Sequence, residues 1–279
     1  MVTGTFLGLS TLDLITMTEN FPNEDTKTLS LQSEIFAGGP ALNAAITYAM
    51  LGGHARLVSM VGANSNRSIE IRRELDKHGI DLIDLADPDF EPPLAVIISA
   101  KEKSSRTVIT SPISDPSGDM SALAERIKDT DVFLWDQHYP TSMMDILQTK
   151  DSRAEVVIDA GSLRAQSAFA LEVADHFLAS QKFETQANTE GFPAQNPNAS
   201  WVITRGAEAI TIKQGAQENT LHPPKVISVD TLGAGDVFHG AFCYYKSTGA
   251  DLIKATENAM LVASNSTQVF GPRDGVKPV

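Results

Sequence analysis

The stretch Val229–Phe242 reads VDTLGAGDVFHGAF and places three small residues, Gly233, Ala234 and Gly235, directly before Asp236. The residues after Asp236 are rich in Ala and Phe and predict a helix that begins at this turn. The first N–H groups of a helix have no intrahelical partner and lie at the positive end of its dipole. Because small residues let these donors approach a ligand, the stretch predicts a site for an anion such as a phosphate.

Asp236 is placed on the rim of this predicted anion site. A carboxylate there can accept the proton of an attacking hydroxyl, a role that contributes roughly 10²–10⁴-fold to a rate. Phosphoryl transfer needs both parts side by side, since positioning and charge stabilisation supply most of its catalysis. A plainer interpretation makes Asp236 only a helix N-cap and the glycines only a tight turn. Taken alone, the motif favours neither interpretation.

Apolar strand-like runs alternate with helix-period segments along most of the chain. The predicted strands are Thr5–Leu9, Val132–Trp135, Glu155–Asp159, Phe177–Ala179 and Trp201–Thr204, and the predicted helices are Asn43–Leu51, Ser68–His78, Ser142–Thr149, Ser167–Ala174, Gly235–Ser247 and Ala250–Ser264. This alternation predicts an α/β fold with a parallel sheet and helices on both faces. A P-loop enzyme and a Rossmann dehydrogenase are disfavoured, because the sequence contains neither glycine motif.

Two regions interrupt the alternation. Ile15–Phe36 is Thr-rich with no helix between its apolar runs, and Leu94–Pro112 reads as a hairpin around a polar turn. Both predict antiparallel strands that project from the parallel core as a small lid, within 13–37 and 92–112. Thr185–Ala199 is rich in Asn, Pro and Gly and predicts a surface loop. We therefore expect one domain, residues 1–279, with a β-strand lid.

Composition limits the classes of partner. The formal net charge is −13, from 22 Lys and Arg against 35 Asp and Glu, which disfavours nucleic acid and anionic membrane surfaces. The single cysteine, Cys243, excludes a disulfide within the chain and predicts a buried apolar side chain. Met1–Ile15 has no basic segment, carries Asp13 and predicts a first strand in place of a signal peptide. No run approaches the ~20 apolar residues of a membrane span, so a cytoplasmic protein is predicted.

Two motifs in the chain resemble those of a known family. DTLGAGDVFHGAF resembles the C-terminal signature of the PfkB, or ribokinase-like, carbohydrate kinases. Ala37–Ala45, AGGPALNAA, resembles the other signature of that family, with Gly52 and Gly62 following at the family's spacing. The likeness extends over nearly the whole chain. Among family members, Phe21–Asp25 and the Ser105–Thr107 step are most similar to ketohexokinase-like and sulfofructose-kinase-like enzymes.

The resemblance implies a three-layer α/β/α fold and an ATP-dependent sugar kinase. It makes Asp236 the base that deprotonates a primary hydroxyl of the sugar, and it places the anion hole at the N–H groups of Gly233, Ala234 and Gly235. The sugar contacts that it implies are Asp13, Gly39, Asn43 and Asp136, and the nucleotide contacts are Thr204 and Gly206. It also implies Mg²⁺, held mainly by phosphates and water.

Three of the candidate residues have a plainer alternative. Asn43 is a competent helix-start residue, so structure alone could explain it. Arg106, in the predicted hairpin, would contact the sugar or an anionic substituent, or else be a solvated arginine. His239 lies on nearly the same helix face as Asp236 and is better explained as a packed or hydrogen-bonded histidine than as a second base.

The chain departs from the family pattern at two places. Many relatives carry an Asn-x-x-Glu that organises Mg²⁺, whereas Ser180 and Phe183 stand at those positions here. Asn188 and Glu190 follow in the predicted loop, and the metal ligands stay unassigned. Relatives usually continue with a further helix beyond the position of Val279, which would bear on packing beside the adenine.

Three functional hypotheses follow. The leading one is a kinase for a free ketohexose or similar sugar. The second is a kinase for an anionic sugar, favoured by Arg106, Lys101, Lys103, Arg164 or His138 in the pocket, or for a nucleoside, favoured by an aromatic clamp. The third is a kinase-like regulator that binds sugar or nucleotide without turnover. A homodimer that pairs through the lid is also expected.

Overall fold

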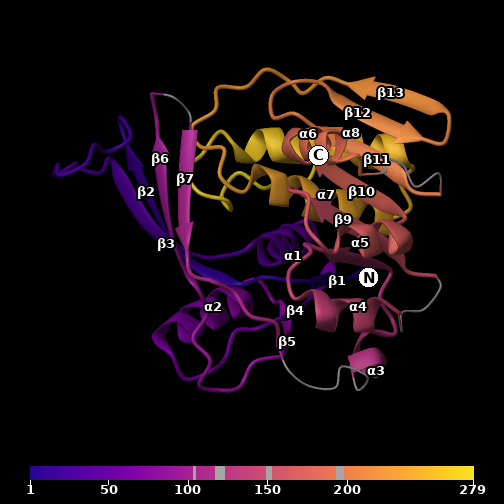
Figure 1. The fold of residues 1–279 in the computed structure, drawn as a ribbon, viewed down its shortest axis with the longest axis horizontal. Helices are drawn as coiled ribbons and strands as arrows, with labels where there is room; N and C mark the ends of the chain where they lie inside the picture. The colour runs from indigo at the N-terminus through magenta and orange to yellow at the C-terminus, as the bar shows by residue number, and fades with distance from the viewer. Residues whose placement is uncertain (103–104, 117–122, 149–152, 193–197) are drawn as a thin grey trace.

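A nine-stranded sheet forms the centre of the computed structural model, which describes residues 1–102, 105–116, 123–148, 153–192 and 198–279. The strand order is β13-β12-β11-β10-β9-β8-β1-β4-β5, and neighbours from β11 through β5 are parallel (Figure 1). Their bounds are β1 Thr3–Leu7, β4 His54–Ser59, β5 Asp81–Asp84, β8 Val132–Trp135, β9 Glu155–Ala160, β10 His176–Ser180, β11 Ser200–Thr204, β12 Ile210–Gln214 and β13 Gln217–Leu221. The antiparallel β12 and β13 extend one edge.

Helices cover both faces of this sheet. They are α1 Pro40–Met50, α2 Asn66–Lys77, α3 Ala124–Ile127, α4 Pro140–Gln148, α5 Ser167–Val173, α6 Gln181–Glu190, α7 Ala234–Ser247 and α8 Leu252–Ser266. Because side chains alternate along a strand, Phe6 packs in the cluster that contains α1, α7 and α8, whereas Leu7 packs against α4 and α5. Strands buried on both faces explain the continuous apolar runs. The predicted three-layer α/β/α fold is confirmed.

A second, smaller sheet projects from one side of the body (Figure 1). Its strand order is β3-β2-β6-β7, with bounds β2 Thr11–Thr18, β3 Gln32–Gly38, β6 Leu94–Ala100 and β7 Ser105–Thr110. β6 and β7 form the predicted antiparallel hairpin, although residues 103–104 lie outside the described part. β2 and β6 are parallel, so the expectation of antiparallel strands alone was wrong.

The N-terminal segment forms two strands where one was expected. β1 ends at Leu7 in the large sheet, and β2 begins at Thr11 in the small one. The Gly8 N–H donates to the carbonyl of Val58 at the end of the β1–β4 pairing, after which the chain changes sheets. Asp13 is therefore carried by the small sheet.

The predicted surface loop Thr185–Ala199 begins inside a helix. Residues 185–190 belong to α6, whose N-cap Ser180 accepts a hydrogen bond from the Phe183 N–H at 3.0 Å. Gly191 ends α6 in the left-handed conformation, at φ 66°. Residues 193–197 lie outside the described part. Asn188 and Glu190 are therefore helical and not in a loop, because Ser180 and Gly191 are a matched pair of helix caps.

Two further expectations can be checked against the helices. α1 begins at Pro40 after Gly39, so Asn43 is a residue of the first helical turns and not a helix-start cap. Cys243 is buried in α7, as predicted, and burial raises the pKa of its thiol.

Within the part of the chain that the structure describes, no helix combines the length and the apolarity needed to cross a bilayer.

Candidate active site

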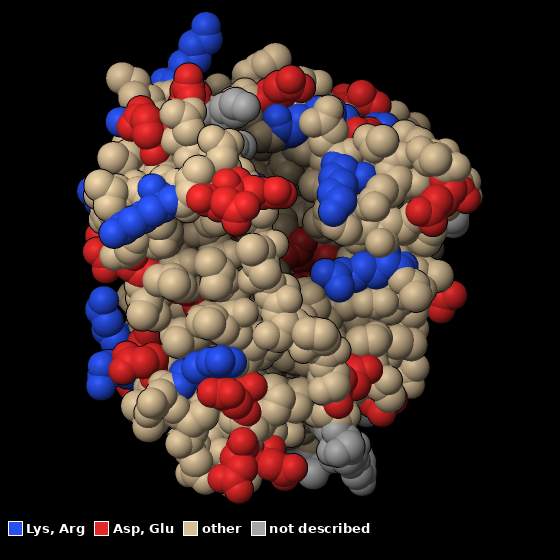
Figure 2. Space-filling view, turned by 60° about the vertical axis from the view of Figure 1, so that its left-hand side comes forward, with Lys and Arg blue, Asp and Glu red and all other residues tan. Residues whose placement is uncertain are grey.

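A cavity lies between the inner face of the small sheet and the first turn of α7. Its empty volume, open mouth included, is about 620 Å³. β2 contributes Asp13, α1 contributes Asn43 and α7 contributes Asp236, while apolar side chains of β6 and β7 form the opposite wall. Figure 2 shows a central hollow in this side of the molecule, with acidic atoms deep inside it and basic side chains on its rim.

The turn before α7 has the backbone that the sequence predicts. Gly233 is the N-cap in the left-handed conformation, at φ 71°, and a Cβ there would meet Pro272 at 3.0 Å. The Ala234 N–H donates weakly to the Thr231 carbonyl at 3.3 Å. The Gly235 N–H lies in the first turn, where a helix leaves donors without an intrahelical partner. A first-turn donor of this kind is suited to binding an anion.

Asp236 is held by α1 across the cavity floor. The Asn43 side-chain N–H donates to Asp236 Oδ2 at 2.7 Å. Asp236 is half-buried, since one side opens to the cavity while protein atoms surround the rest. Burial raises the pKa of Asp236 to about 7 and the charge of Asp159 adds to this, against the opposing effects of Asn43, His239 and Arg106. A pKa near neutral pH is well suited to a general base.

The sequence interpretation missed Asp159, which lies beside Asp236. It stands near the carboxyl end of β9, and Asp159 Oδ2 is 3.3 Å from Nδ1 of His239. Burial alone would lower the pKa of His239, but Asp159 raises it above its ordinary value. His239 is thus a paired, buried histidine, in agreement with the plainer sequence interpretation. An acidic residue at the carboxyl end of a parallel strand was the signal that could have identified Asp159.

The cluster of Asp159, Asp236 and His239 does not fit a magnesium site. Their ligand atoms lie within 4.8 Å of one another. His239 faces Asp159, however, and Asp236 accepts a hydrogen bond from Asn43, whereas Mg²⁺ requires near-octahedral oxygen ligands. At the family's metal motif, Phe183 is buried and the next residue, Glu184, is bound by Arg205 through both carboxylate oxygens.

Asp13 and Gly39 both line the cavity, as expected for sugar contacts. Thr11 donates to Asp13 Oδ1 at 2.5 Å, and burial raises the pKa of Asp13 to about 6. A Cβ on Gly38 would meet Asp13 Oδ2 at 2.0 Å, so the carboxylate packs directly over this glycine. Gly39 has φ 102°, and a Cβ there would lie 2.2 Å from the Leu9 carbonyl oxygen. The glycines of the first signature thus allow α1 and β2 to approach closely.

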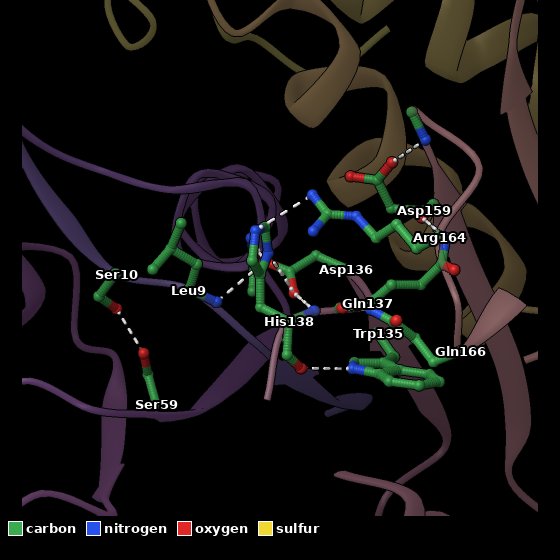
Figure 3. A network of polar contacts seen from close by, with 12 residues as sticks. Leu9, Ser10, Ser59, Trp135, Asp136, Gln137, His138, Asp159, Arg164 and Gln166 are labelled. Carbon is green, nitrogen blue, oxygen red and sulfur yellow. Dashed lines mark hydrogen bonds and ion pairs between the residues drawn. The ribbon is translucent and has the colours of Figure 1, made fainter. Parts of the chain in front are cut away.

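Asp136, directly after β8, is not among the residues that line the cavity and instead belongs to a network of polar contacts (Figure 3). Its Oδ2 accepts the N–H groups of Leu9 at 2.9 Å and Ala41 at 3.2 Å, and its Oδ1 accepts the His138 N–H at 2.9 Å. Nδ1 of His138 lies 3.1 Å from the same Oδ1. Burial alone would raise the pKa of Asp136, but His138 and these hydrogen bonds hold it below its ordinary value. Its oxygens are therefore occupied by the protein itself.

Other candidates lie at the edges of the site. Arg106 on β7 is exposed and donates to the Thr231 carbonyl at 3.2 Å, directly before the Gly233 turn. Thr204 ends β11 and donates to the Ala179 carbonyl at 3.4 Å, and Gly206 follows at φ 62°. Neither Thr204 nor Gly206 lines the cavity. His138 and Arg164 contact each other, with Nε2 and a guanidinium nitrogen 3.2 Å apart (Figure 3).

The sequence and the fold were compared with those of known proteins. The pfkB family carbohydrate kinases match residues 5–189 and 178–278. Ribokinase of Bacillus subtilis is 26% identical over 281 residues, which cover 97% of this chain and 94% of that protein. Ribokinase of Cryptococcus neoformans in complex with ADP has a TM-score of 0.78 at 17% identity, covering 100% and 97% of the two chains. Burkholderia thailandensis nucleoside kinase in complex with inosine has a TM-score of 0.79 at 19% identity, covering 99% and 94%.

The solved structures, at these low identities, show a shared kinase fold. The chain belongs to the pfkB family of carbohydrate kinases, since the family matches nearly its whole length. It is accordingly a carbohydrate kinase of the ribokinase-like group. The closer likeness to ketohexokinase-like members stays a prediction.

Proposed function

We propose that the protein transfers the γ-phosphoryl group of ATP to a hydroxyl of a small sugar, with Asp236 as the base. The observation that carries this proposal is the position of Asp236 on the cavity floor, beside the first turn of α7. The pKa of Asp236, raised to about 7, lets the carboxylate accept a proton near neutral pH. The sugar hydroxyl would thereby be activated next to the donors that receive the phosphoryl group.

The nucleotide would lie along the Gly233–Asp236 turn. The N–H groups of this turn, Gly235 above all, would stabilise the charge of the transferring phosphoryl group, and Thr204 and Gly206 would line the nucleotide site further along the sheet edge. Mg²⁺ would be held by phosphate oxygens and water, because the described acidic residues beside the turn are already paired. When bound, the ion would neutralise phosphate charge. Asp236 would remain the proton acceptor.

The cavity favours a neutral polyol over an anionic sugar or a nucleoside. Among the described residues that line it, Asp13 and Asp236 are the charged ones, and both are acidic. Arg106 is bonded to the Thr231 carbonyl, and no aromatic ring lines the cavity within the described part. Asp13, Asn43 and the Gly39 backbone offer hydrogen bonds to hydroxyls. We therefore propose a ketohexose-type sugar, phosphorylated on its primary hydroxyl.

The small sheet would act as a lid within a single kinase domain. Its inner face supplies Asp13, Ile97 and Val108 to the cavity. Closure of this sheet would exclude water, which competes with the sugar for the γ-phosphate. The cytoplasmic location stays a prediction, which rests on the sequence.

The first experiment measures ADP release with Mg-ATP over a panel of acceptors: fructose, ribose, fructose 6-phosphate, sulfofructose, ketodeoxygluconate and adenosine. We expect the highest kcat/KM on a neutral sugar, because the cavity lining is acidic. ATP hydrolysis without an acceptor is the control. Preference for a phosphorylated, sulfonated or carboxylated acceptor would instead place Arg106 in the substrate site. Absence of turnover with retained ATP binding would favour the regulatory hypothesis.

The outer face of the small sheet is where we propose that two copies pair. Leu14, Ile35, Val96 and Ile109 stand in one row across its four strands, and the side chains of Ile35 and Ile109 are 60% and 61% exposed. We expect Ile109→Lys to convert a dimer to a monomer in light scattering. Ile227→Lys is the control, because Ile227 is 89% exposed and outside both sheets. A wild-type protein that is monomeric at high concentration would exclude this dimer.

A further inference from the structure

Arg273 is a buried arginine in the segment after α8, with 6% of its surface exposed. Its guanidinium donates to three groups from three elements: Nε to Glu74 Oε1 at 2.8 Å, one terminal nitrogen to Asn43 Oδ1 at 2.7 Å, and the other to the Ala37 carbonyl. These partners lie in α2, α1 and β3. Few side chains other than arginine carry enough donors in a rigid plane for such a set.

Glu74 completes a clamp on Ala37. Its second carboxylate oxygen accepts the Ala37 N–H at 2.6 Å, while Arg273 binds the Ala37 carbonyl. Ala37 lies in β3 directly before Gly38 and Gly39, which connect the small sheet to α1. The N–H and the carbonyl of Ala37 are thus both bound by the ion pair of Arg273 and Glu74, in which Nε and Oε1 lie 2.8 Å apart.

The same arginine determines which way the Asn43 amide faces. A guanidinium carries donors only, so the group of Asn43 that meets Arg273 must be its oxygen. The amide NH₂ then necessarily points to the other side, where it donates to Asp236 Oδ2 at 2.7 Å. Without Arg273, the amide could turn its oxygen toward the carboxylate.

We propose that Arg273 is a positioning residue for phosphoryl transfer: it keeps the Asn43 N–H donor directed at Asp236. Together with Glu74, it also links Ala37, at the end of β3, to Asn43. The catalytic part of this proposal rests on the function proposed for Asp236. The orientation of the amide is a separate claim that can be tested without turnover. A hydrogen bond to the ionised form favours that form, so the donor helps to keep the base ionised.

A change at Arg273 also acts on Asp13, because the charge of Arg273 lowers the pKa of Asp13 and that of Glu74 raises it. Several titratable and charged groups surround Asp236 and Arg273. They are Asp159 from β9, His239 from α7, Arg106 from β7 and Asp13 from β2, with Glu74 as the remaining charge beside Arg273. A variant that removes Arg273 alone would leave Glu74 without its partner and could unfold the protein. Two variants avoid this: Arg273→Lys keeps the charge with fewer directed donors, and the double variant Arg273→Met/Glu74→Gln removes both charges.

The test has two readouts on these variants. The first is a ¹³C NMR titration of the Asp236 carboxyl in the free protein, assigned with Asp236→Asn. The second is the pH profile of kcat/KM on the best acceptor. We expect both midpoints to move up by about one to two pH units, which corresponds to losing a hydrogen bond to an ionised group. At pH 7, kcat/KM would then fall roughly five- to fifty-fold and recover above pH 9.

Arg72→Lys is the matched control. Arg72 lies in α2 and, like Arg273, binds both a carboxylate, that of Asp84, and a backbone carbonyl, that of Gly62. Neither hydrogen bond involves Asn43 or Asp236. The profile of Arg72→Lys should match the wild type. An unchanged NMR midpoint in folded variants, or a loss of activity equal at every pH, would overturn the inference. A shifted NMR midpoint with no wild-type turnover on any acceptor would preserve the amide orientation and reject the proposed function instead.

Discussion

Asp236→Asn is expected to lower kcat by about 10²–10⁴-fold on the accepted sugar, because the variant loses the group that takes the proton of the hydroxyl. Asn is isosteric and can still accept the Asn43 hydrogen bond that Asp236 accepts at 2.7 Å. The sugar should therefore bind with nearly unchanged KM. The measurement is ADP release at saturating ATP and sugar, compared across wild type and variant.

The same substitution is expected to maintain or raise the melting temperature at pH 8. The folded-state pKa of Asp236, about 7, lies above its unfolded value, so ionisation of Asp236 destabilises the fold as pH rises through this range. A neutral amide avoids this cost, and the difference should vanish near pH 4. Loss of activity with gain of stability is the combination expected of a group retained for chemistry.

Asp251→Asn provides the control for this experiment. Asp251 also stands at the start of a helix, where it caps α8 by accepting from the Lys254 N–H at 2.8 Å. Its replacement should leave kcat unchanged and the melting temperature nearly unchanged, because Asn caps a helix about as well as Asp. Turnover that persists at wild-type rates in Asp236→Asn would remove the role given to Asp236.

Local sequence patterns predicted much of the fold, because they report on residues close together in the chain. The Gly233–Asp236 turn, the apolar strand Val132–Trp135 and the hairpin of β6 and β7 each carry their own signal. The helix over residues 185–190 was missed, although its caps were readable, since its polar composition resembles that of a loop. Edge strands β12 and β13 were also missed, as polar exposed strands alternate weakly.

The site was only partly predictable, because its contacts join distant parts of the chain. Asn43 and Asp236 came from motifs, but nothing local indicates that Arg273 binds Asn43 across 230 positions. Asp159 ends a strand that the sequence predicts, but its pairing with His239, 80 positions away, has no local signal. By resemblance the sequence made Asp136 a sugar contact, whereas its neighbour His138 was named only for the alternative of an anionic sugar. The structure separates a side chain that faces a cavity from one that satisfies buried N–H groups.

Asp136→Asn is expected to destabilise the protein by about 1–3 kcal/mol, because it leaves a buried N–H donor of this network without an acceptor. The new NH₂ group would face a backbone N–H of Leu9, Ala41 or His138, and two donors cannot bond to each other. The measurement is chemical unfolding at pH 7. Asp175→Asn is the control: Asp175 is exposed and accepts the Val156 N–H at 2.8 Å, so it should cost about 0.5 kcal/mol.

The pH dependence of this deficit follows from the lowered pKa of Asp136. A carboxyl with a depressed folded-state pKa stabilises the fold above its unfolded value of about 3.9, and the contribution is lost as pH falls through the folded value. The gap between wild type and Asp136→Asn should therefore narrow in acid below about pH 4. A sugar-contacting Asp136 predicts the opposite pattern, a raised KM with unchanged stability. That outcome would return Asp136 to the substrate site and require the Asp136–His138 pair to open when sugar binds.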